Sequence, residues 1–382
     1  MKTDFKKVMV IAGSYVATLI GSGYATGQEI MQFFVFYGLG AIIVSLIVMA
    51  IYSLLAIEVL ERGRLVKPTQ NTKIFQFYAG KYLGTFFEYF ALLFLFGVVV
   101  VMVSGAGDTL NEYYGLNRYV GRIFVAVCMF LTVSGGLKKL VNIIGNIGPV
   151  IIIFTIAISL YSLFSTPLSD VKLGSEFIQN ASVQRPVANP IMAGFNYASF
   201  NVIVVIAYLS GLGRVNTRKE NVLGGLIGGI TLGITALIMA LAMLSKADII
   251  YQNQVPALVL ADNLSPIVGK FFSVILFLGI YTTAVTLNWQ ISDKFVSEDS
   301  PNFKYMTLFV SVLAFFCGFV PFDKLVSTIY PYTGYVGLIL LALMLIKAIK
   351  LKNVKDGGYE EMRQIEESLK EYTNARTEVE VD

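Results

Sequence analysis

Long apolar runs recur along most of the chain, and they restrict its fold more than any other feature of the sequence. Each is close to the ~20 residues that an α-helix needs to cross a hydrocarbon core about 30 Å thick. Membrane-spanning β-strands are about half as long and alternate in hydrophobicity. The sequence therefore predicts an all-α polytopic membrane protein with about ten transmembrane helices, at residues 7–36, 39–60, 84–106, 119–136, 140–164, 187–212, 221–245, 267–291, 304–321 and 325–348.

Composition agrees with this prediction. Of the 382 residues, 56% are hydrophobic and 14% are charged, which is far more apolar than a soluble domain of this length. Histidine is absent, and Cys128 and Cys317 lie inside apolar runs, where a thiol packs as a small apolar group. Because the sequence has no nucleophile–base pair, phosphate loop or metal cluster, we expect neither an enzyme nor a bound cofactor. The expected partners are the lipid bilayer and a small-molecule substrate, not nucleic acid.

Lysines and arginines predict the orientation, because they are enriched in cytoplasmic loops. With ten spans and the N-terminus inside, 22 of the 29 basic residues lie on the cytoplasmic side. An odd number of spans would break this alternation. We therefore expect a multi-pass protein of the cytoplasmic membrane with both termini in the cytoplasm. The seven basic residues left outside are Arg118, Arg122, Lys172, Arg185, Lys246, Lys270 and Lys324.

Two segments outside the runs have their own composition. Residues 245–266 are apolar enough to pack as a cap rather than float free. Residues 349–382 are charged and cannot span, so the transmembrane domain is expected at 1–348 and a cytoplasmic tail at 349–382. For the tail, a short amphipathic helix at 359–372, lying on the membrane or against the body, and an unstructured segment are both open.

The first run is interrupted at its centre by the stretch TLIGSGYATGQEIMQFF, residues 18–34. Glycine costs about 1 kcal/mol relative to alanine inside a helix, so the helix is expected to unwind at Gly21–Gly23. Unwound backbone at membrane depth is tolerated where it lines a cavity. In broken-helix transporters such backbone faces a coupling cation and an anionic group of the substrate. A packing surface for a neighbouring helix is the alternative.

Two other runs carry polar groups near their centres. The sixth has Asn196, Tyr197, Ser199 and Asn201, which line a pathway or bond across helices. The eighth has Thr282, Thr283 and Thr286. Threonines in membrane helices often bond back to their own backbone, but adjacent hydroxyls beside backbone carbonyls also suit a hard cation such as sodium.

Glu29 is a carboxylate inside the first apolar run, and an acid at membrane depth is a candidate functional residue by default. Three roles stay open: it binds the ammonium group of a cationic substrate, takes up a coupled proton, or bonds a polar neighbour to shape the outer gate. The structural alternative is an acid that caps the amides of the second half-helix.

Two stretches resemble a known family: LIGSGYATGQEIMQFFVFYGLGAIIVSLIVMA and FLGIYTTAVT. The first is similar to the first two helices of the amino acid–polyamine–organocation (APC) superfamily, which has the bacterial leucine transporter fold, and to its YkvI-like membrane proteins. The second resembles that fold's eighth helix, where two consecutive Ser/Thr residues complete a sodium site. The resemblance covers all ten runs. It implies a 5+5 inverted repeat, residues 7–164 and 187–348, with discontinuous helices 1 and 6 and a central substrate site.

Carried over residue by residue, the resemblance implies a sodium site. Its ligands are the hydroxyls of Thr282 and Thr283 and the backbone oxygens of Ala17, Ile20 and Gly279. Proton-coupled relatives can place a lysine from the fifth helix near this position, and the fifth run here has none within the membrane. Sodium is therefore the preferred coupling ion.

The expected function is a secondary active transporter that works by alternating access, with sodium-coupled symport of a small solute such as an amino acid or an amine. Two alternatives stay open: a proton-coupled carrier that uses Glu29, and a receptor-like member of the fold that senses a ligand without transport. The sequence does not specify the solute. The expected substrate site comprises Gly21, Ser22, Gly23, Tyr24, Glu29, Asn196, Tyr197, Ser199 and Tyr281.

Overall fold

The computed structural model describes residues 3–135, 141–352 and 357–379; for 141–148 and 370–379 it describes the helix but not the side chains. Within these residues every regular element is a helix, which confirms the predicted all-α class. The elements are α1 (Phe5–Leu19), α2 (Ser22–Ala25), α3 (Gln28–Phe33), η1 (Val35–Gly40), α4 (Ala41–Val66), η2 (Asn71–Lys73), α5 (Ile74–Tyr114), α6 (Arg118–Ser134), α7 (Val141–Phe164), α8 (Leu168–Asn180), α9 (Pro190–Gly213), α10 (Arg218–Leu244), α11 (Ala247–Ile250), α12 (Pro256–Leu264), α13 (Pro266–Phe295), α14 (Phe303–Cys317), α15 (Phe322–Lys350) and α16 (Tyr359–Val379).

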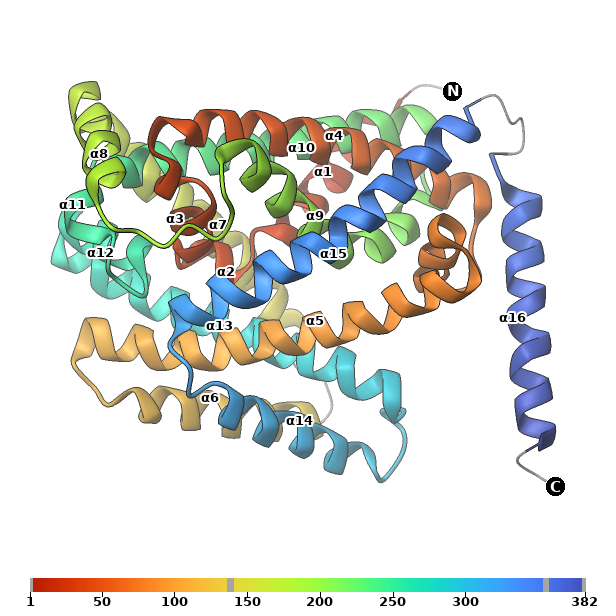
Figure 1. Cartoon of the computed structure of the whole chain (residues 1–382). Helices are drawn as coiled ribbons and strands as arrows, with labels where there is room; N and C mark the ends of the chain where they lie inside the picture. The colour runs from red at the N-terminus through yellow and green to blue at the C-terminus, as the bar shows by residue number, and fades with distance from the viewer. Residues whose placement is uncertain (1–2, 136–140, 353–356, 380–382) are drawn as a thin grey trace.

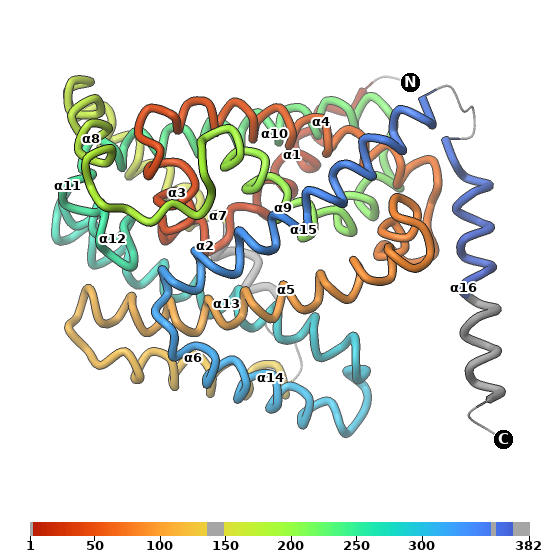
Figure 2. Tube along the Cα trace, viewed as in Figure 1, coloured from red at the N-terminus to blue at the C-terminus, as the bar shows by residue number. Residues whose placement is uncertain are grey.

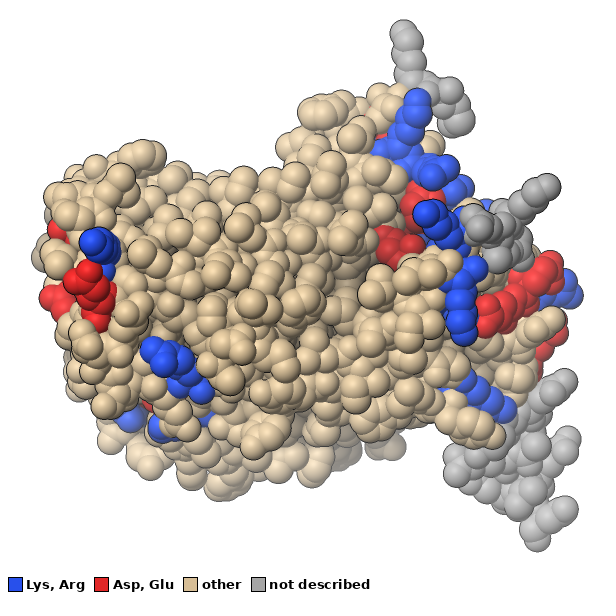
Figure 3. Space-filling view, turned by 45° about the horizontal axis from the view of Figure 1, so that its top comes forward, with Lys and Arg blue, Asp and Glu red and all other residues tan. Residues whose placement is uncertain are grey.

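The long helices run along one axis of the molecule, and two ends can be distinguished (Figure 1). The terminal end carries the start of α1 and helix α16, and the cap end carries α8, α11 and α12. On the face shown in Figure 3, acidic and basic side chains gather at these two ends and leave an uncharged belt between them. A belt of this kind suits a protein that crosses a bilayer along the helix axis.

Six stretches of the described chain are long and apolar enough to cross a membrane: Val35–Val66, Asn71–Tyr114, Pro190–Gly213, Arg218–Leu244, Pro266–Phe295 and Phe322–Lys350. A seventh is the pair Pro149–Phe164 and Leu168–Asn180, which is bent by 103°. The described parts of the remaining predicted runs lie on α1–α3, α6 and α14, which are shorter. The number of ten spans and the inverted repeat stay predictions. Lys138 and Lys139, two of the basic residues predicted to be cytoplasmic, lie outside the described residues.

The helices form two groups. In one, α4 packs on α9 and α10, and α1 packs on α10; in the other, α5 packs on α6 and α13, and α14 packs on α6. Helix α15 contacts both groups. Small residues allow the close packing in the first group: a Cβ on Gly229 of α10 would lie 2.4 Å from the backbone nitrogen of Ser53 in α4. The space between the two groups holds the candidate site.

The predicted interruption of the first helix is confirmed. Helix α1 ends at Leu19, and the chain continues as two short pieces, α2 and α3, which Figure 2 follows as a bent trace. Gly27 joins the two pieces with a φ of 85°, a left-handed conformation that favours glycine. A Cβ at Gly27 would also lie 2.9 Å from the backbone nitrogen of Ala257, so the position needs glycine twice over.

The predicted discontinuity of helix 6 is wrong, because α9 is one uninterrupted helix from Pro190 to Gly213. Between Gly194 and Gly211 its sequence has neither glycine nor proline to open the backbone. Two of its polar side chains instead bond to backbone carbonyls one turn earlier in the same helix, which leaves the helix intact. Asn201 Nδ2 donates to the Tyr197 carbonyl at 3.0 Å, and Ser199 Oγ donates to the Phe195 carbonyl at 2.6 Å. Polar residues at the centre of a span therefore did not signal unwinding here.

The charged tail contains a helix that docks on the body. Helix α16 crosses the terminal end of the bundle (Figure 1), and Met362 on it is 1% exposed. Glu366 Oε1 accepts hydrogen bonds from Thr69 N at 2.7 Å and Thr69 Oγ1 at 2.8 Å, and Arg62 Nη1 donates to the Gly357 carbonyl at 2.8 Å. Of the alternatives that the sequence left open, the structure contains the helix that lies against the body.

Candidate functional site

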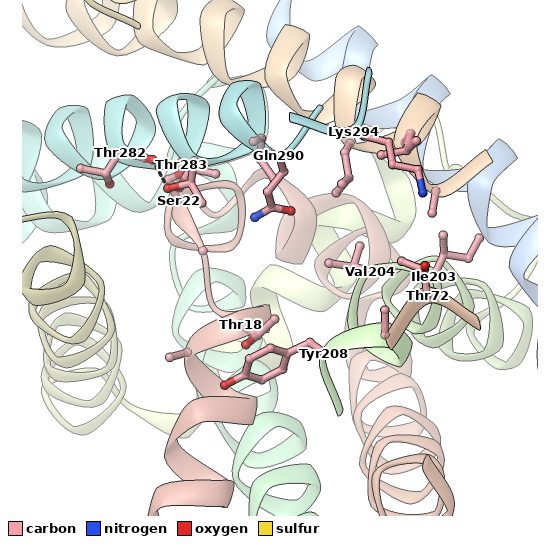
Figure 4. Close-up of a pocket in the computed structure, with 18 of the residues that line it drawn as sticks. Thr18, Ser22, Thr72, Ile203, Val204, Tyr208, Thr282, Thr283, Gln290 and Lys294 are labelled. Atoms are coloured by element: carbon pink, nitrogen blue, oxygen red, sulfur yellow. Dashed lines mark hydrogen bonds between the residues drawn. The ribbon is translucent and has the colours of Figure 1, made fainter. Parts of the chain in front are cut away.

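A cavity of ≈ 550 Å³ begins at the break in the first helix and lies between the two helix groups. Its deep part is lined by Ile20, Gly21 and Ser22, and its wall toward the terminal end includes Thr72 and the exposed Lys294. Helix α13 contributes Thr282, Thr283, Gln290 and Lys294 in a row (Figure 4). The cavity therefore leads from the helix break toward the terminal end.

A smaller chamber of ≈ 120 Å³ continues from the deep part of this cavity and shares Ser22, Thr283 and Val204 with it. The break in the first helix, α5, α9, α13 and α15 supply its walls. Its lining is Thr18, Leu19, Gly21, Ser22, Gly23, Tyr24, Glu29, Phe94, Leu95, Val98, Met102, Phe200, Asn201, Val204, Thr283, Leu287 and Tyr330. We call this space the inner chamber.

Glu29 is the one charged residue in the lining of the inner chamber, and it is 7% exposed. Its Oε2 accepts a hydrogen bond from the Tyr197 hydroxyl at 3.3 Å. Its Oε1 approaches the α-carbon of Gly23 so closely that a Cβ there would lie 2.6 Å from it. The same Cβ would lie 3.4 Å from the Tyr330 hydroxyl oxygen, so the carboxylate and this hydroxyl both face Gly23.

The start of α2 is bonded to the second helix group. Ser22 Oγ lies 3.0 Å from Thr283 Oγ1 on α13 (Figure 4). It also lies 2.8 Å from Met102 Sδ on α5. Residues at the end of α1, where the last backbone carbonyls of a helix lack an intrahelical donor, line the same cavity as these hydroxyls. Groups of this kind can bind a cation.

Four of the five predicted ion-site residues line one cavity, and the ion site itself stays a prediction. Ala17, Ile20, Thr282 and Thr283 all line the same cavity. The fifth, Gly279, is not in its lining, but the Thr282 hydroxyl donates to the Gly279 carbonyl at 3.0 Å, and a Cβ on Gly279 would lie 3.7 Å from the Ser22 Cβ.

The predicted substrate-site residues separate into two sets. Gly21, Ser22, Gly23, Tyr24 and Glu29 line the inner chamber, and Tyr197 bonds to Glu29 from behind. The others lie elsewhere. They are Asn196, whose amide donates to the Pro331 carbonyl at 3.0 Å, Ser199, which bonds within α9, and Tyr281, whose hydroxyl is 2.5 Å from Thr132 Oγ1 on α6.

The aromatic wall of the chamber did not follow from the sequence analysis. Phe94 of α5, Phe200 of α9 and Tyr330 of α15 lie side by side, with ring centroids 4.9 to 6.0 Å apart. Only Tyr330 carried a local signal, because it precedes Pro331 in the middle of an apolar run. The two phenylalanines are indistinguishable in sequence from others in their runs.

The cap end is closed over the chamber by residues 254–264, which we call the cap segment. Ala257 N donates to the Thr26 carbonyl at 3.0 Å, next to the helix break. Glu112 of α5 accepts from the backbone nitrogens of Gln254, at 2.5 Å, and Val255, at 2.9 Å. Gln254 Oε1 in turn accepts from Asp323 N at 2.9 Å. The cap segment is therefore tied to the first helix, to α5 and to α15.

A separate depression of ≈ 370 Å³ at the cap end is lined by Gln28 and Gln32 of α3, together with Asn253 and Asp323. Gln28 lines this depression, whereas the next residue, Glu29, lines the inner chamber. A single turn of α3 thus stands between the two spaces.

An ion-pair cluster stands beside the mouth of the large cavity. Glu88 of α5 is bonded to Lys294 of α13 at 2.8 Å and to Lys73 of η2 at 3.4 Å, and Gln76 Nε2 donates to it at 2.8 Å. The cluster joins α5, α13 and the segment that precedes α5. Two of its members, Glu88 and Lys294, line the cavity.

Solved structures with this fold define a class of protein. The chain superposes on an inward-facing conformation of Mhp1 with a TM-score of 0.63, covering 90% of this chain and 77% of Mhp1 at 14% identity. It superposes on MhsT in complex with L-phenylalanine with a TM-score of 0.53, covering 89% of this chain and 88% of MhsT at 16% identity. For a mutant of the Eremococcus coleocola manganese transporter the TM-score is 0.52, and the match covers 94% of this chain and 92% of that protein at 14% identity. The fold is that of the bacterial leucine transporter, and these neighbours are membrane transporters rather than enzymes.

In sequence, the chain is similar to two proteins of Bacillus subtilis (strain 168). It is 25% identical over 340 residues to the uncharacterized membrane protein YkvI, covering 88% of this chain and 95% of YkvI. It is also 25% identical over 371 residues to the uncharacterized protein YyaD, covering 92% and 98%. No protein-family model matches the chain.

Proposed function

We propose that this chain is a secondary active transporter that couples inward movement of sodium to uptake of a small solute by alternating access. The observation that carries the proposal is the cavity that starts at a broken helix and leads to one end of the molecule, while the cap segment closes the other end. Alternating access needs such a one-sided path around a fixed central site. With the predicted orientation, the terminal end is cytoplasmic and this conformation faces inward.

The proposed sodium site comprises Ala17, Ile20, Gly279, Thr282 and Thr283. In its support, α1 ends at Leu19, so carbonyls of its last turn lack an intrahelical partner. Two threonine hydroxyls stand on the facing helix. Neutral oxygen ligands suit a hard, weakly charged cation. Ser22 lines both the large cavity, where the proposed ion site lies, and the inner chamber. Binding of an ion at the site can therefore be coupled to binding of a solute in the chamber.

Uptake into sealed vesicles tests the transport proposal. The purified chain in proteoliposomes is expected to accumulate a radiolabelled solute, chosen by screening amino acids and amines, when sodium is high outside. Vesicles with equal sodium on both sides, and vesicles without protein, are the controls. If ligands stabilise the protein but none accumulates under a sodium or a proton gradient, the chain is a receptor-like module and not a transporter.

Thermal unfolding tests the ion site. The purified chain is expected to unfold at a higher temperature in sodium than in potassium, because an ion that binds only the folded state stabilises it. Thr282→Ala should remove the difference. Thr286→Ala is the matched control, because Thr286 also lines the cavity and also bonds to its own helix backbone, but it is not one of the proposed ligands. Equal unfolding temperatures of the parent in the two salts would reject the site.

A proton-coupled carrier is the second candidate, and Glu29 favours it. Within the described part of the chain, no lysine or arginine forms an ion pair with this buried carboxylate. A buried acid without a cationic partner is neutralised by a proton or a bound cation. Accumulation driven by a proton gradient in sodium-free buffer, and lost in Glu29→Gln, would favour this candidate.

A further inference from the structure

The charge of the inner chamber restricts what it can hold. Glu29 is its one charged residue, and its lining includes neither lysine nor arginine. A buried carboxylate without a countercharge is strongly unfavourable, and a bound cation removes that cost. The hydroxyls of Tyr197 and Tyr330 near it are neutral. When Glu29 is ionised, the chamber therefore lacks one positive charge, which a ligand can supply.

The aromatic wall suits the same kind of ligand. Phe94, Phe200 and Tyr330 are mutual neighbours, and all three line the chamber together with Glu29. Cations are attracted to aromatic faces within about 6 Å of the ring centroid, and the attraction grows when water is excluded. All three rings are buried, so an ammonium group in this space lies among apolar groups apart from the carboxylate.

The unbroken helix α9 removes another possible partner for an ammonium group. Carbonyls inside a continuous helix accept from the amide four residues later and do not turn toward a ligand. The side chains of Asn196 and Ser199 also point to partners outside the chamber. Among the residues that line the chamber, Glu29 is thus the strongest acceptor for an ammonium donor.

The size of the chamber and its single negative charge argue against a second carboxylate. An apolar cavity of about 150 Å³ holds benzene, and this one measures ≈ 120 Å³. About six heavy atoms of a ligand fill the chamber itself, which is continuous with the large cavity. The carboxylate of an amino acid of that size would lie within a few ångströms of Glu29, where no basic side chain lines the space.

We propose that the inner chamber binds a small organic monoammonium ion without a carboxylate, with the ammonium group at Glu29 and the carbon chain against Phe94, Phe200 and Tyr330. This inference rests on the proposed transport function and names the class of solute. It selects the amine from the two classes, amino acid and amine, that the sequence left open.

Four probes of matched size separate charge from shape. They are n-butylammonium, the neutral 1-butanol, the anion butyrate and the zwitterion L-2-aminobutyrate. Thermal unfolding of the purified full chain is measured against each at fixed sodium. Butylammonium is expected to raise the unfolding temperature in a saturable way. Butanol and butyrate are expected to give no saturable rise. Aminobutyrate is expected to need at least a tenfold higher concentration than butylammonium for the same rise in unfolding temperature.

Variants connect the effect to the chamber. Glu29→Gln keeps the shape of the side chain, removes its charge and is expected to abolish the butylammonium shift. Glu29→Asp, which keeps the charge, and Phe94→Leu, which keeps the carboxylate, are expected to weaken it and serve if the first variant does not fold. Glu176→Gln is the matched control, because Glu176 is exposed on α8 at the cap end. It should leave the shift unchanged.

The result can contradict this inference without touching the proposed function. If aminobutyrate stabilises the chain at lower concentration than butylammonium, the chamber takes a zwitterion and the inference is wrong, while sodium-driven uptake stands on its own assay. A butylammonium shift that persists in Glu29→Gln and in Phe94→Leu places binding elsewhere. No shift with butylammonium in the parent overturns the inference as well.

Discussion

Two glycines in one motif have different surroundings. A Cβ at Gly23 would lie 2.6 Å from Glu29 Oε1, whereas a Cβ at Gly21 would meet no heavy atom within 4 Å. The sequence predicted the interruption at these glycines from helix propensity alone. It could not predict that Gly23 makes room for a carboxylate six residues later, because that contact depends on how α3 folds back on α2.

Gly23→Ala should therefore impair the site. Overpacking costs about 1–3 kcal/mol, so the carboxylate is expected to move and solute binding to fall about 10- to 100-fold. The thermal shift caused by the solute that screening identifies measures this loss. Gly13→Ala is the control, because Gly13 is exposed on α1 and a Cβ there would meet no heavy atom within 4 Å. Equal losses in both variants would mean that room for Glu29 is not what matters.

Tyr281 shows that the direction of a side chain is hard to predict from a uniformly apolar sequence. Successive residues on a helix point about 100° apart, so Tyr281 cannot face the same cavity as both Thr282 and Thr283. The structure turns the two threonines to the cavity and Tyr281 toward α6. An almost uniformly apolar run has no hydrophobic periodicity, so its sequence does not show which face of the helix points to the cavity.

At the scale of elements, the length of the apolar runs predicted where the helices lie. Contacts between distant parts of the chain determine whether a helix is continuous and where it docks. The run at 187–212 became one continuous helix because its polar residues have helical partners. The tail became a docked helix because Glu366 bonds to Thr69, 297 positions earlier in the chain, and because Met362 is buried. Such meetings are not visible in local sequence. The interruption of the first helix was predictable because its cause, glycine, is local.

Loosening α16 should expose the tail. Met362 is fully buried, and truncating a buried methionine to alanine costs about 2–5 kcal/mol. Met362→Ala is expected to increase the rate of proteolytic cleavage after Lys352 at least several-fold. Glu367→Ala is the control on the same helix, because the exposed Glu367 pairs with the exposed Arg363 at 3.1 Å, one turn away on α16. Unchanged cleavage in Met362→Ala would mean that other contacts hold the tail.

At the scale of the whole molecule, one path is open and the other is closed. The large cavity leads to the terminal end, and the cap segment is bonded to three helices at the cap end. Apolar runs predicted the bundle, and residues 245–266 were expected to form a cap. Which end is open could not be predicted, because one sequence encodes every conformation that the chain adopts.

Weakening the cap segment should favour a state open at the cap end. Glu112 accepts two backbone hydrogen bonds, and a bond to a charged group contributes about 1.5–3 kcal/mol. Glu112→Gln is expected to speed labelling of Gln28→Cys by an impermeant maleimide about tenfold, in a chain with Cys128 and Cys317 replaced by alanine. Gln28 is buried in this conformation. Glu176→Gln is the control, and equal labelling rates in the two variants would contradict the proposed role of Glu112.

The bond between Ser22 and Thr283 has a thermodynamic consequence. It joins the broken helix to α13 at the proposed ion site, so an ion that competes for these oxygens also changes the relation of the two helix groups. Linkage is reciprocal: if sodium shifts the balance between conformations by some factor, locking one conformation shifts sodium affinity by the same factor. A chain cross-linked in this state should therefore report the coupling through its affinity for sodium alone, before any solute is known.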